Sequence, residues 1–155
     1  ADINGDGILD LVTGAGPGGG PHVKVFDVAS NTLISQWFAY PPEFSGGVFV
    51  GVGDISNDGN FEVITGPGVG FVPLVAVWNP FNGELLSQFL AFDQQFTGGV
   101  RVGISDATGD NILDLVTGAG PGGGPQVKAF NFPNLDLLFT FFSGPESNRQ
   151  GVFVN

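Results

Sequence analysis

The sequence predicts an all-β protein built from three repeated units. Of its 155 residues, 27 are Gly and 11 are Pro. In a helix interior Gly costs about 1 kcal/mol and Pro about 3 kcal/mol, so long helices are disfavoured. Hydrophobic residues make up 42% of the chain, which is sufficient for a buried core in a domain of this size. The third observation is an internal repeat, which indicates a repeat architecture.

The repeat is clearest in a segment rich in Gly and Pro. Residues 13–21, with the sequence TGAGPGGGP, return unchanged at 117–125, and a related segment occupies 65–73. Successive copies are therefore 52 residues apart, and matches such as Leu33, Leu85 and Leu137 keep that spacing without a gap. We expect a single repeat domain with repeat 1 at 1–46, repeat 2 at 47–98, repeat 3 at 99–150 and a remaining segment at 151–155.

Each unit is expected to contain four short strands. In the second unit these are strand A at 47–53, strand B at 61–65, strand C at 74–78 and strand D at 85–92. An acidic loop separates A from B, a Gly/Pro-rich loop separates B from C, and Asn82-Gly83 is a hairpin turn signal before D. Four-stranded units with a period near 50 predict a β-propeller-like array of three four-stranded blades.

The two ends of the sequence fall inside units. The first unit lacks a strand A, whereas residues 151–155 have the pattern of a strand A without a blade of its own. We expect this orphan strand to complete a neighbouring blade, so that copies join head to tail by strand exchange. Such a contact makes a ring if the geometry closes and a filament if it does not. The alternative is that the three blades adjoin others in a larger protein.

Three acidic loops, one per unit, hold most of the carboxylates: acidic loop 1 (2–10), acidic loop 2 (54–62) and acidic loop 3 (106–114). Each has oxygen-bearing side chains at positions 1, 3, 5 and 9, and Gly or Asn at position 6, where a left-handed turn is expected. Calcium takes about 6–8 oxygen ligands, which alternate residues of a tight loop can supply. Including the backbone carbonyl of position 7, the candidate ligands are Asp2, Asn4, Asp6, Ile8, Asp10, Asp54, Ser56, Asp58, Asn60, Glu62, Asp106, Thr108, Asp110, Ile112 and Asp114.

Two other interpretations of these loops are open. They could be turns whose Asp and Asn side chains cap their own backbone. They could also bind magnesium, although magnesium keeps more of its waters and takes fewer protein ligands. Three loops in register favour Ca²⁺, because a cation offsets the repulsion between three carboxylates within nine residues. We therefore expect Ca²⁺ as a structural cofactor.

The pattern D-x-N-x-D-G-x-x-D at 2–10, the β unit of about 50 residues and the Gly/Pro run after strand B resemble the FG-GAP repeats of integrin-α-type β-propellers. They resemble the VCBS or FG-GAP-like repeats of bacterial extracellular proteins more closely. The resemblance implies structural calcium between the first two strands of each blade, at Asp2, Asn4, Asp6, Asp10 and their equivalents. The family's Phe-Gly pair is changed at 44–46 and 96–98, and the ligand-binding loops of integrins have no match.

Charge and hydropathy exclude several functional classes. The net charge is −11, and the four Lys and Arg residues are scattered, which excludes electrostatic capture of nucleic acid. Gly and Pro interrupt the longest uncharged run, so no membrane insertion is expected. His22 is the one histidine, and the repeated positions offer no base or nucleophile, so we do not expect an enzyme.

The expected function is that of a calcium-stabilised extracellular module with a structural or adhesive role, secreted or at the cell surface. External calcium fills sites as weak as roughly 10⁻⁴–10⁻³ M, which suits that location. The expected partners are other copies of the chain or adjoining blades, together with glycans or cell-surface proteins. One alternative is a propeller lectin, for which Trp37, Tyr40 and Asp93 are the candidate sugar contacts. The other is a non-catalytic module of a larger secreted protein.

Overall fold

The computed structural model describes residues 1–154, and this part of the chain is all-β with no helix. The strands are β1 (Leu11–Gly14), β2 (His22–Asp27), β3 (Thr32–Phe38), β4 (Val48–Gly53), β5 (Glu62–Pro67), β6 (Leu74–Trp78), β7 (Leu85–Leu90), β8 (Val100–Ser105), β9 (Asp114–Ala119), β10 (Gln126–Phe130) and β11 (Leu137–Phe142). Nowhere in the described residues is there a helix long and apolar enough to cross a membrane.

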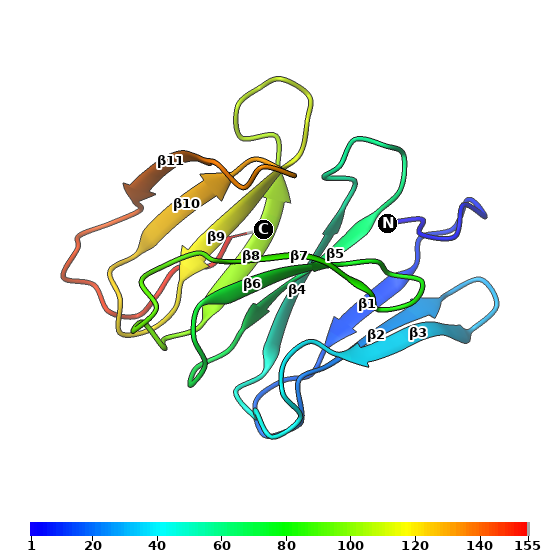
Figure 1. Cartoon of the computed structure of the whole chain (residues 1–155), viewed down its shortest axis with the longest axis horizontal. Coiled ribbons are helices and arrows are strands. Elements are labelled where there is room, and N and C mark those ends of the chain that lie inside the picture. Colours follow the sequence, from blue (N-terminus) through cyan, green and yellow to red (C-terminus); the bar gives the residue numbers. More distant parts are fainter. Residues whose placement is uncertain (155) are drawn as a thin grey trace.

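The strands form three antiparallel sheets in which consecutive strands are neighbours (Figure 1). The orders are β1-β2-β3, β4-β5-β6-β7 and β8-β9-β10-β11. Strands β8 to β11 begin 52 residues after β4 to β7, as the repeat predicts. The first sheet holds the equivalents of strands B, C and D. The predicted strand C at 74–78 matches β6, whereas the predicted strand D extended two residues beyond the end of β7 at Leu90.

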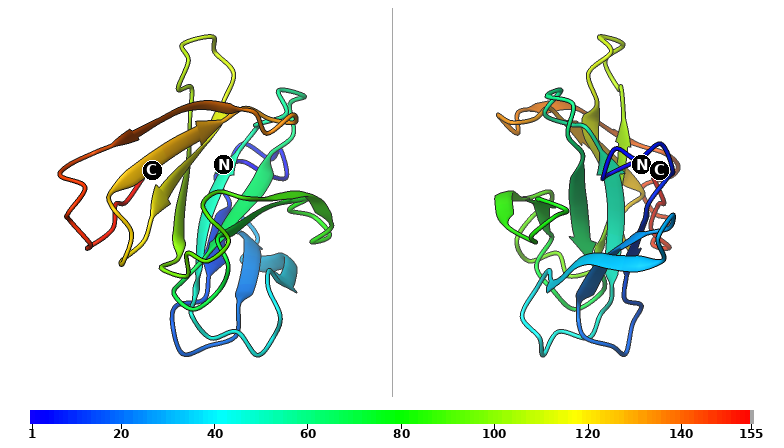
Figure 2. Two further views of the ribbon diagram at one scale, coloured as in Figure 1. Left: turned by 60° about the vertical axis from the view of Figure 1, so that its left-hand side comes forward. Right: turned by 90° about the vertical axis from the view of Figure 1, so that its right-hand side faces the viewer.

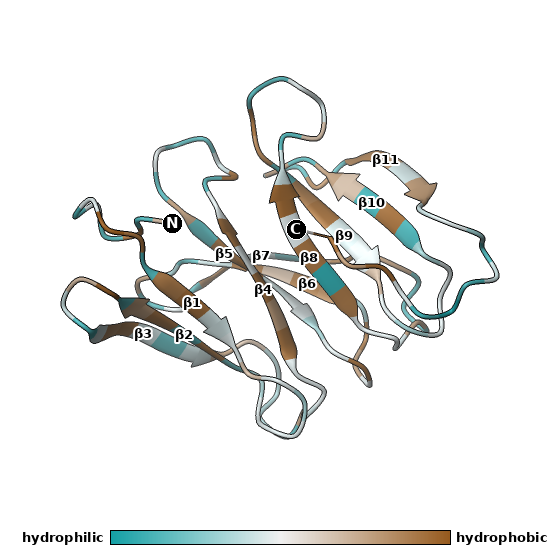
Figure 3. Cartoon of the chain, turned by 180° about the vertical axis from the view of Figure 1, so that it is seen from behind, coloured by the Kyte–Doolittle hydropathy of each residue, from teal (hydrophilic) through white to brown (hydrophobic). Residues whose placement is uncertain are grey.

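Adjacent sheets pack face to face, which buries the core. One core cluster joins Val23 of β2 to Val63 and Trp78 of the second sheet, and the other joins Ile64 and Val75 to the third sheet. The first strand of each four-stranded sheet faces the preceding unit, and β4 and β8 lie side by side (Figures 1 and 2). Apolar residues dominate β4 and β8, as Figure 3 shows. Each sheet therefore buries a face against its neighbour in the array.

One backbone contact within each unit repeats along with the sequence. The Gly18 N–H donates to the Ser45 carbonyl at 2.9 Å, and the Gly70 N–H donates to the Thr97 carbonyl at the same distance. The third copy of this bond runs from Gly122 to Arg149. Since donor and acceptor are both backbone groups, the bond survives changes of side chain. The same backbone geometry thus holds the Gly/Pro-rich loop of each unit against the segment that leads into the next unit.

Glycine is required where one unit meets the next. A Cβ at Gly66 in β5 would lie 2.4 Å from the Val100 carbonyl oxygen of the following unit, and a Cβ at Gly14 would lie 2.4 Å from that of Val48. Real Cβ atoms do not approach oxygen so closely, so only Gly permits this backbone contact. This close approach is the structural reason for part of the high Gly content.

Residues 151–154 lie against the third unit without forming a strand. The Val152 N–H donates to the Ala119 carbonyl at 2.9 Å, as the Val48 N–H donates to the Ala15 carbonyl at 2.8 Å. The segment thus contacts the preceding unit as β4 does. β4 is a strand because it also pairs with β5, and no described residue pairs in that way with residues 151–154. Asn155, which completes the predicted orphan strand, lies outside the described residues.

We expect Gly68→Ala to destabilise the protein by about 1–3 kcal/mol, as overpacking does. Its Cβ would lie 1.8 Å from the Gly46 carbonyl oxygen, and backbone cannot move aside cheaply. Chemical denaturation measures the change. Gly16→Ala is the matched control, because Gly16 is the equivalent residue of the first unit and a Cβ there has no neighbour within 4 Å. Equal effects of the two substitutions would contradict a role for close packing between units.

Candidate functional site

The three acidic loops lead into the same strand of each sheet. Loop 2 connects β4 to β5, loop 3 connects β8 to β9, and loop 1 precedes β1. Loops 2 and 3 project from the same end of the array (Figure 1). Their position-9 acids, Glu62 and Asp114, are the first residues of β5 and β9 and are only 5% and 3% exposed. The sheet therefore fixes the closing carboxylate of the loop.

The position-1 carboxylate folds each loop around itself. Asp2 accepts the N–H groups of Gly5, Asp6 and Gly7 at 2.8–3.1 Å, using both carboxylate oxygens. In loop 3, Asp106 likewise accepts three N–H groups, from Gly109, Asp110 and Asn111. In loop 2, Asp54 accepts two, from Asp58 and Gly59. The hydrogen bond from the Asn111 N–H has the largest effect on the pKa of the Asp106 carboxyl and lowers it. Desolvation has the next largest effect and acts in the opposite direction.

Positions 5 and 9 hold the rest of the loop. The position-5 carboxylates accept the N–H of position 7, at 2.8 Å in the contact from Ile8 to Asp6. The position-9 carboxylates accept the N–H of position 2, at 2.8 Å in the contact from Ile3 to Asp10. The corresponding contacts in the other loops join Asn60 to Asp58, Ile112 to Asp110, Ile55 to Glu62 and Ala107 to Asp114. The side chains that were predicted as ligands thus also order the turn.

The position-3 side chains differ among the loops. The Asn4 Oδ1 accepts the Asp6 N–H at 3.0 Å, whereas the Ser56 hydroxyl donates to Glu62 Oε1 at 3.1 Å. Thr108 is exposed in loop 3. Burial raises the pKa of the Glu62 carboxyl against the opposing effect of its hydrogen bonds. In loop 2 the closing carboxylate is therefore desolvated without a positive partner to offset its charge.

Two positions of each loop have left-handed backbone. The predicted one is position 6, where Gly7, Gly59 and Asn111 have φ of 88°, 87° and 66°. The second is position 4, where Gly5, Asn57 and Gly109 have φ of 77°, 54° and 82°. Sequence reasoning missed position 4, although the recurrence of Gly or Asn there was a visible signal. Gly and Asn are the residues that adopt this conformation most readily.

The donor chemistry of loop 1 fits a hard cation. Its side-chain oxygens come from three carboxylates and one amide. One of them, Asp10 Oδ1, is buried without any hydrogen-bond donor. A buried carboxylate oxygen without a donor is unfavourable, and a cation bound to that oxygen would offset the cost. In residues 1–154, however, no three His, Asp or Glu side chains are close enough together to hold a metal ion as they stand. Binding would thus require the carboxylates of a loop to turn inward.

The other candidate residues lie mostly in packing positions. The Tyr40 hydroxyl is buried, donates to the Leu74 carbonyl at 3.0 Å, and has a pKa raised by burial. The Trp37 ring packs against that of Trp78, with ring centroids 5.9 Å apart. His22 lies on β2 against Phe38. Asp93 is exposed after β7 and accepts the Gln95 N–H at 2.9 Å.

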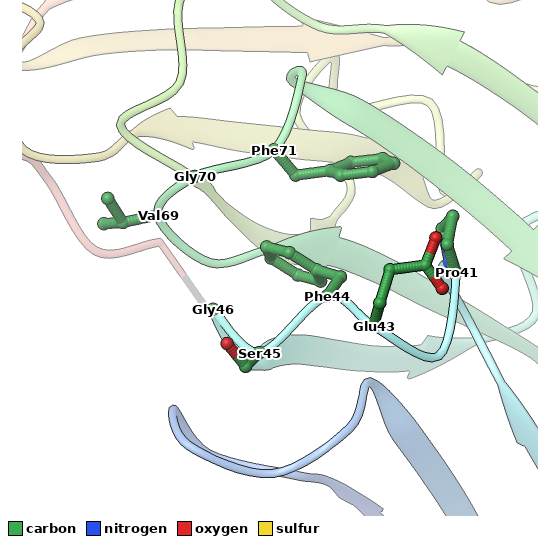
Figure 4. A pocket seen from close by; sticks show the side chains of 8 residues that line it. All are labelled: Pro41, Glu43, Phe44, Ser45, Gly46, Val69, Gly70 and Phe71. Carbon is green, nitrogen blue, oxygen red and sulfur yellow. The ribbon is translucent and has the colours of Figure 1, made fainter.

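The structure adds a groove that sequence reasoning did not identify. A groove of about 530 Å³ lies between the loop after β3 and the loop after β5, where the Phe44 and Phe71 rings approach to 5.1 Å between centroids (Figure 4). Glu43 and Ser45 also line it (Figure 4). A second groove, of about 320 Å³, contains Gln95, Phe96 and Thr97, which are 52 residues further along. The groove therefore repeats with the unit, although two distant loops must meet to form it.

Neither a protein-family model nor a curated protein matches the chain. A functional proposal accordingly rests on the chain's own residues.

In metal-free buffer we expect Asp106→Asn to destabilise the protein by about 1–2 kcal/mol. The amide keeps one oxygen acceptor but places an N–H₂ against the Asn111 N–H, which Asp106 Oδ2 accepts at 2.9 Å. Asp110→Asn is the matched control, because Asp110 uses only one oxygen, for the Ile112 N–H. Its effect should stay below about 0.5 kcal/mol. Equal losses in denaturant unfolding would mean that the second oxygen of Asp106 does not order the loop.

Proposed function

We propose that the chain is a calcium-stabilised extracellular module with a structural or adhesive, non-catalytic role. Each acidic loop binds one Ca²⁺, which supplies positive charge to a cluster of carboxylates. The observation that carries this proposal is the buried Asp10 Oδ1, which has no hydrogen-bond donor although Oδ2 of the same carboxylate accepts two N–H groups of the loop. No Lys or Arg occurs within any of the three loops, so the chain provides no internal counter-charge there.

The residues of each loop would have different roles in binding an ion. The position-1 carboxylate orders the turn through its N–H contacts, and the strand start anchors position 9. The side chains of positions 3 and 5 are exposed in loop 1, so Asn4 and Asp6 are free to reorient toward an ion. The equivalent side chains would hold the ion in loops 2 and 3. These loops differ from loop 1 in that Ser56 and Thr108 replace Asn4, and Glu62 replaces Asp10. A calcium ion would thus lock a turn that is already formed.

We propose that the three sheets are blades of a propeller-like array. Packed sheets lie about 10 Å apart, so a straight stack would separate equivalent side chains of alternate layers by roughly 20 Å. The equivalent residues Phe49 and Phe153 nevertheless have ring centroids 6.5 Å apart. This supports units that turn about a common axis, with β4, β8 and residues 151–154 nearest to it. An adjoining blade, in another copy or the same polypeptide, would pair with the free edge of β1.

Calcium titration tests the proposal. We expect Asp6→Ala to lower the calcium stoichiometry by about one ion per chain and to lower Tm in millimolar calcium, measured by calorimetry. Asp93→Ala is the matched control: Asp93, outside the loops, accepts the N–H two residues ahead, as Asp6 does. Repeating Tm in chelator separates loss of the turn contact from loss of the ion. An unchanged stoichiometry in Asp6→Ala would overturn the assignment of loop 1.

The repeated grooves favour glycan binding as a second candidate function. Each is lined by an aromatic ring, a hydroxyl group and a carboxylate or amide side chain, which are Phe44, Ser45 and Glu43 in the first groove and Phe96, Thr97 and Gln95 in the second. Sugars stack on aromatic faces and bond to such polar groups. Tyr40 would support the groove from beneath, since its ring lies 5.8 Å from that of Phe44. Two grooves on one chain would make binding bivalent.

For a glycan identified on an array, we expect Glu43→Ala to weaken binding about tenfold or more, because hydrogen bonds to charged groups contribute roughly 1.5–3 kcal/mol. Glu84→Ala, at an exposed acid in the turn before β7, is the control and should bind as the unchanged chain does. Titration calorimetry gives both affinities. If neither substitution changes the affinity, the groove is not the glycan site.

A further inference from the structure

Arg101 is a buried cation without an acceptor. It lies in β8, is only 9% exposed, and its Nε and Nη1 atoms are buried with no hydrogen-bond partner. A guanidinium carries five N–H donors and stays charged at any ordinary pH. Desolvation lowers the pKa of Arg101. Burying such a group is unfavourable unless an acceptor pairs with it.

Three neighbours fix the position of the guanidinium. Its Cζ lies 4.9 Å from the Phe49 ring centroid and 4.8 Å from that of Phe153. The two rings meet at 78°, so they form the walls of a corner around the cation. Nη1 lies directly over Gly120, where a Cβ would be 2.2 Å away. The aromatic faces stabilise the charge but accept none of its in-plane N–H bonds.

Packing alone does not explain an arginine at this place. Phe49, Arg101 and Phe153 are equivalent residues of successive units, each 52 residues after the last. An apolar ring therefore fits this position of the strand, and two of these three equivalent residues provide one. A cation occurs at this position in one unit alone. Its Nε and Nη1 donors require an acceptor, and the described residues do not provide one.

We propose that Arg101 binds a small oxyanion, a carboxylate, sulfate or phosphate, in the aromatic corner formed by Phe49 and Phe153. Two in-plane N–H groups would bond to two oxygens of the anion, the arrangement in which guanidinium recognises such groups best. The partly buried Phe49 ring would limit the access of water to one side of the pair and so strengthen it. This site shares no residue with the acidic loops, so the proposal of anion binding does not depend on calcium binding.

The chain allows a direct test because it contains only two arginines, Arg101 and Arg149. NMR spectra of the Arg Nε–H groups in the calcium-free protein should show two signals, which Arg149→Met assigns. Sodium acetate and sodium sulfate are titrated at constant ionic strength, with chloride as the balancing salt. We expect the Arg101 signal to shift and saturate in the millimolar range for at least one of the two anions. Arg149 lies on the surface and donates to the Glu146 carbonyl, so its signal should change only weakly and without saturation.

The thermal response provides a second readout. Sulfate stabilises most proteins by exclusion from their surface, so only the difference between variants is informative. We expect the bound anion to raise Tm in the unchanged chain and in Arg149→Met by an amount that Arg101→Met lacks. If Arg101→Met does not fold, the Nε–H titration of the unchanged chain decides. An Arg101 signal that does not saturate with either anion, or equal Tm responses in all three proteins, would overturn the proposal.

Discussion

The structure depends on the close approach of backbone between successive units. At Gly66 the strand of one unit lies so near the Val100 carbonyl of the next that no Cβ fits, and Gly14 repeats this contact. Backbone bonds such as that from the Val48 N–H to the Ala15 carbonyl accompany it. A single sheet cannot bury both of its faces, and this contact sets the distance at which the neighbouring sheet covers one of them. The buried core between the sheets follows from that distance.

The acidic loops are held differently, because their side chains accept hydrogen bonds from the backbone of the same loop. Both oxygens of Asp2 accept N–H groups of its own loop, and the left-handed turns at Gly5 and Gly7 direct those groups inward. This is the behaviour of a capped turn, one of the two alternatives to calcium that the sequence left open. The two interpretations are compatible, since a carboxylate has lone pairs for several partners. The buried and unpartnered Asp10 Oδ1 favours an ion in addition to the turn.

Departures from the repeat are more informative about function than the repeat itself. Where three units share a residue type, packing or turn geometry accounts for it, as at Gly66 and its equivalents. Arg101 is equivalent to Phe49 and Phe153, and Glu62 is equivalent to Asp10 and Asp114. Both are charged and both are nearly buried. Each therefore places a charged side chain in a buried position where the repeated residues provide no partner of opposite charge.

The sequence by itself determined the all-β class, the 52-residue unit, the acidic loops and the left-handed turn at Gly7, Gly59 and Asn111. These are local or periodic properties, so residue types at fixed spacings are sufficient to predict them. Only the tertiary structure decided that Tyr40 is buried, that the loops holding Phe44 and Phe71 meet in a groove, and that Phe49, Arg101 and Phe153 meet in one cluster. Those contacts join residues from different units. Their distances depend on how one sheet turns relative to the next, and a linear pattern carries no information about that rotation.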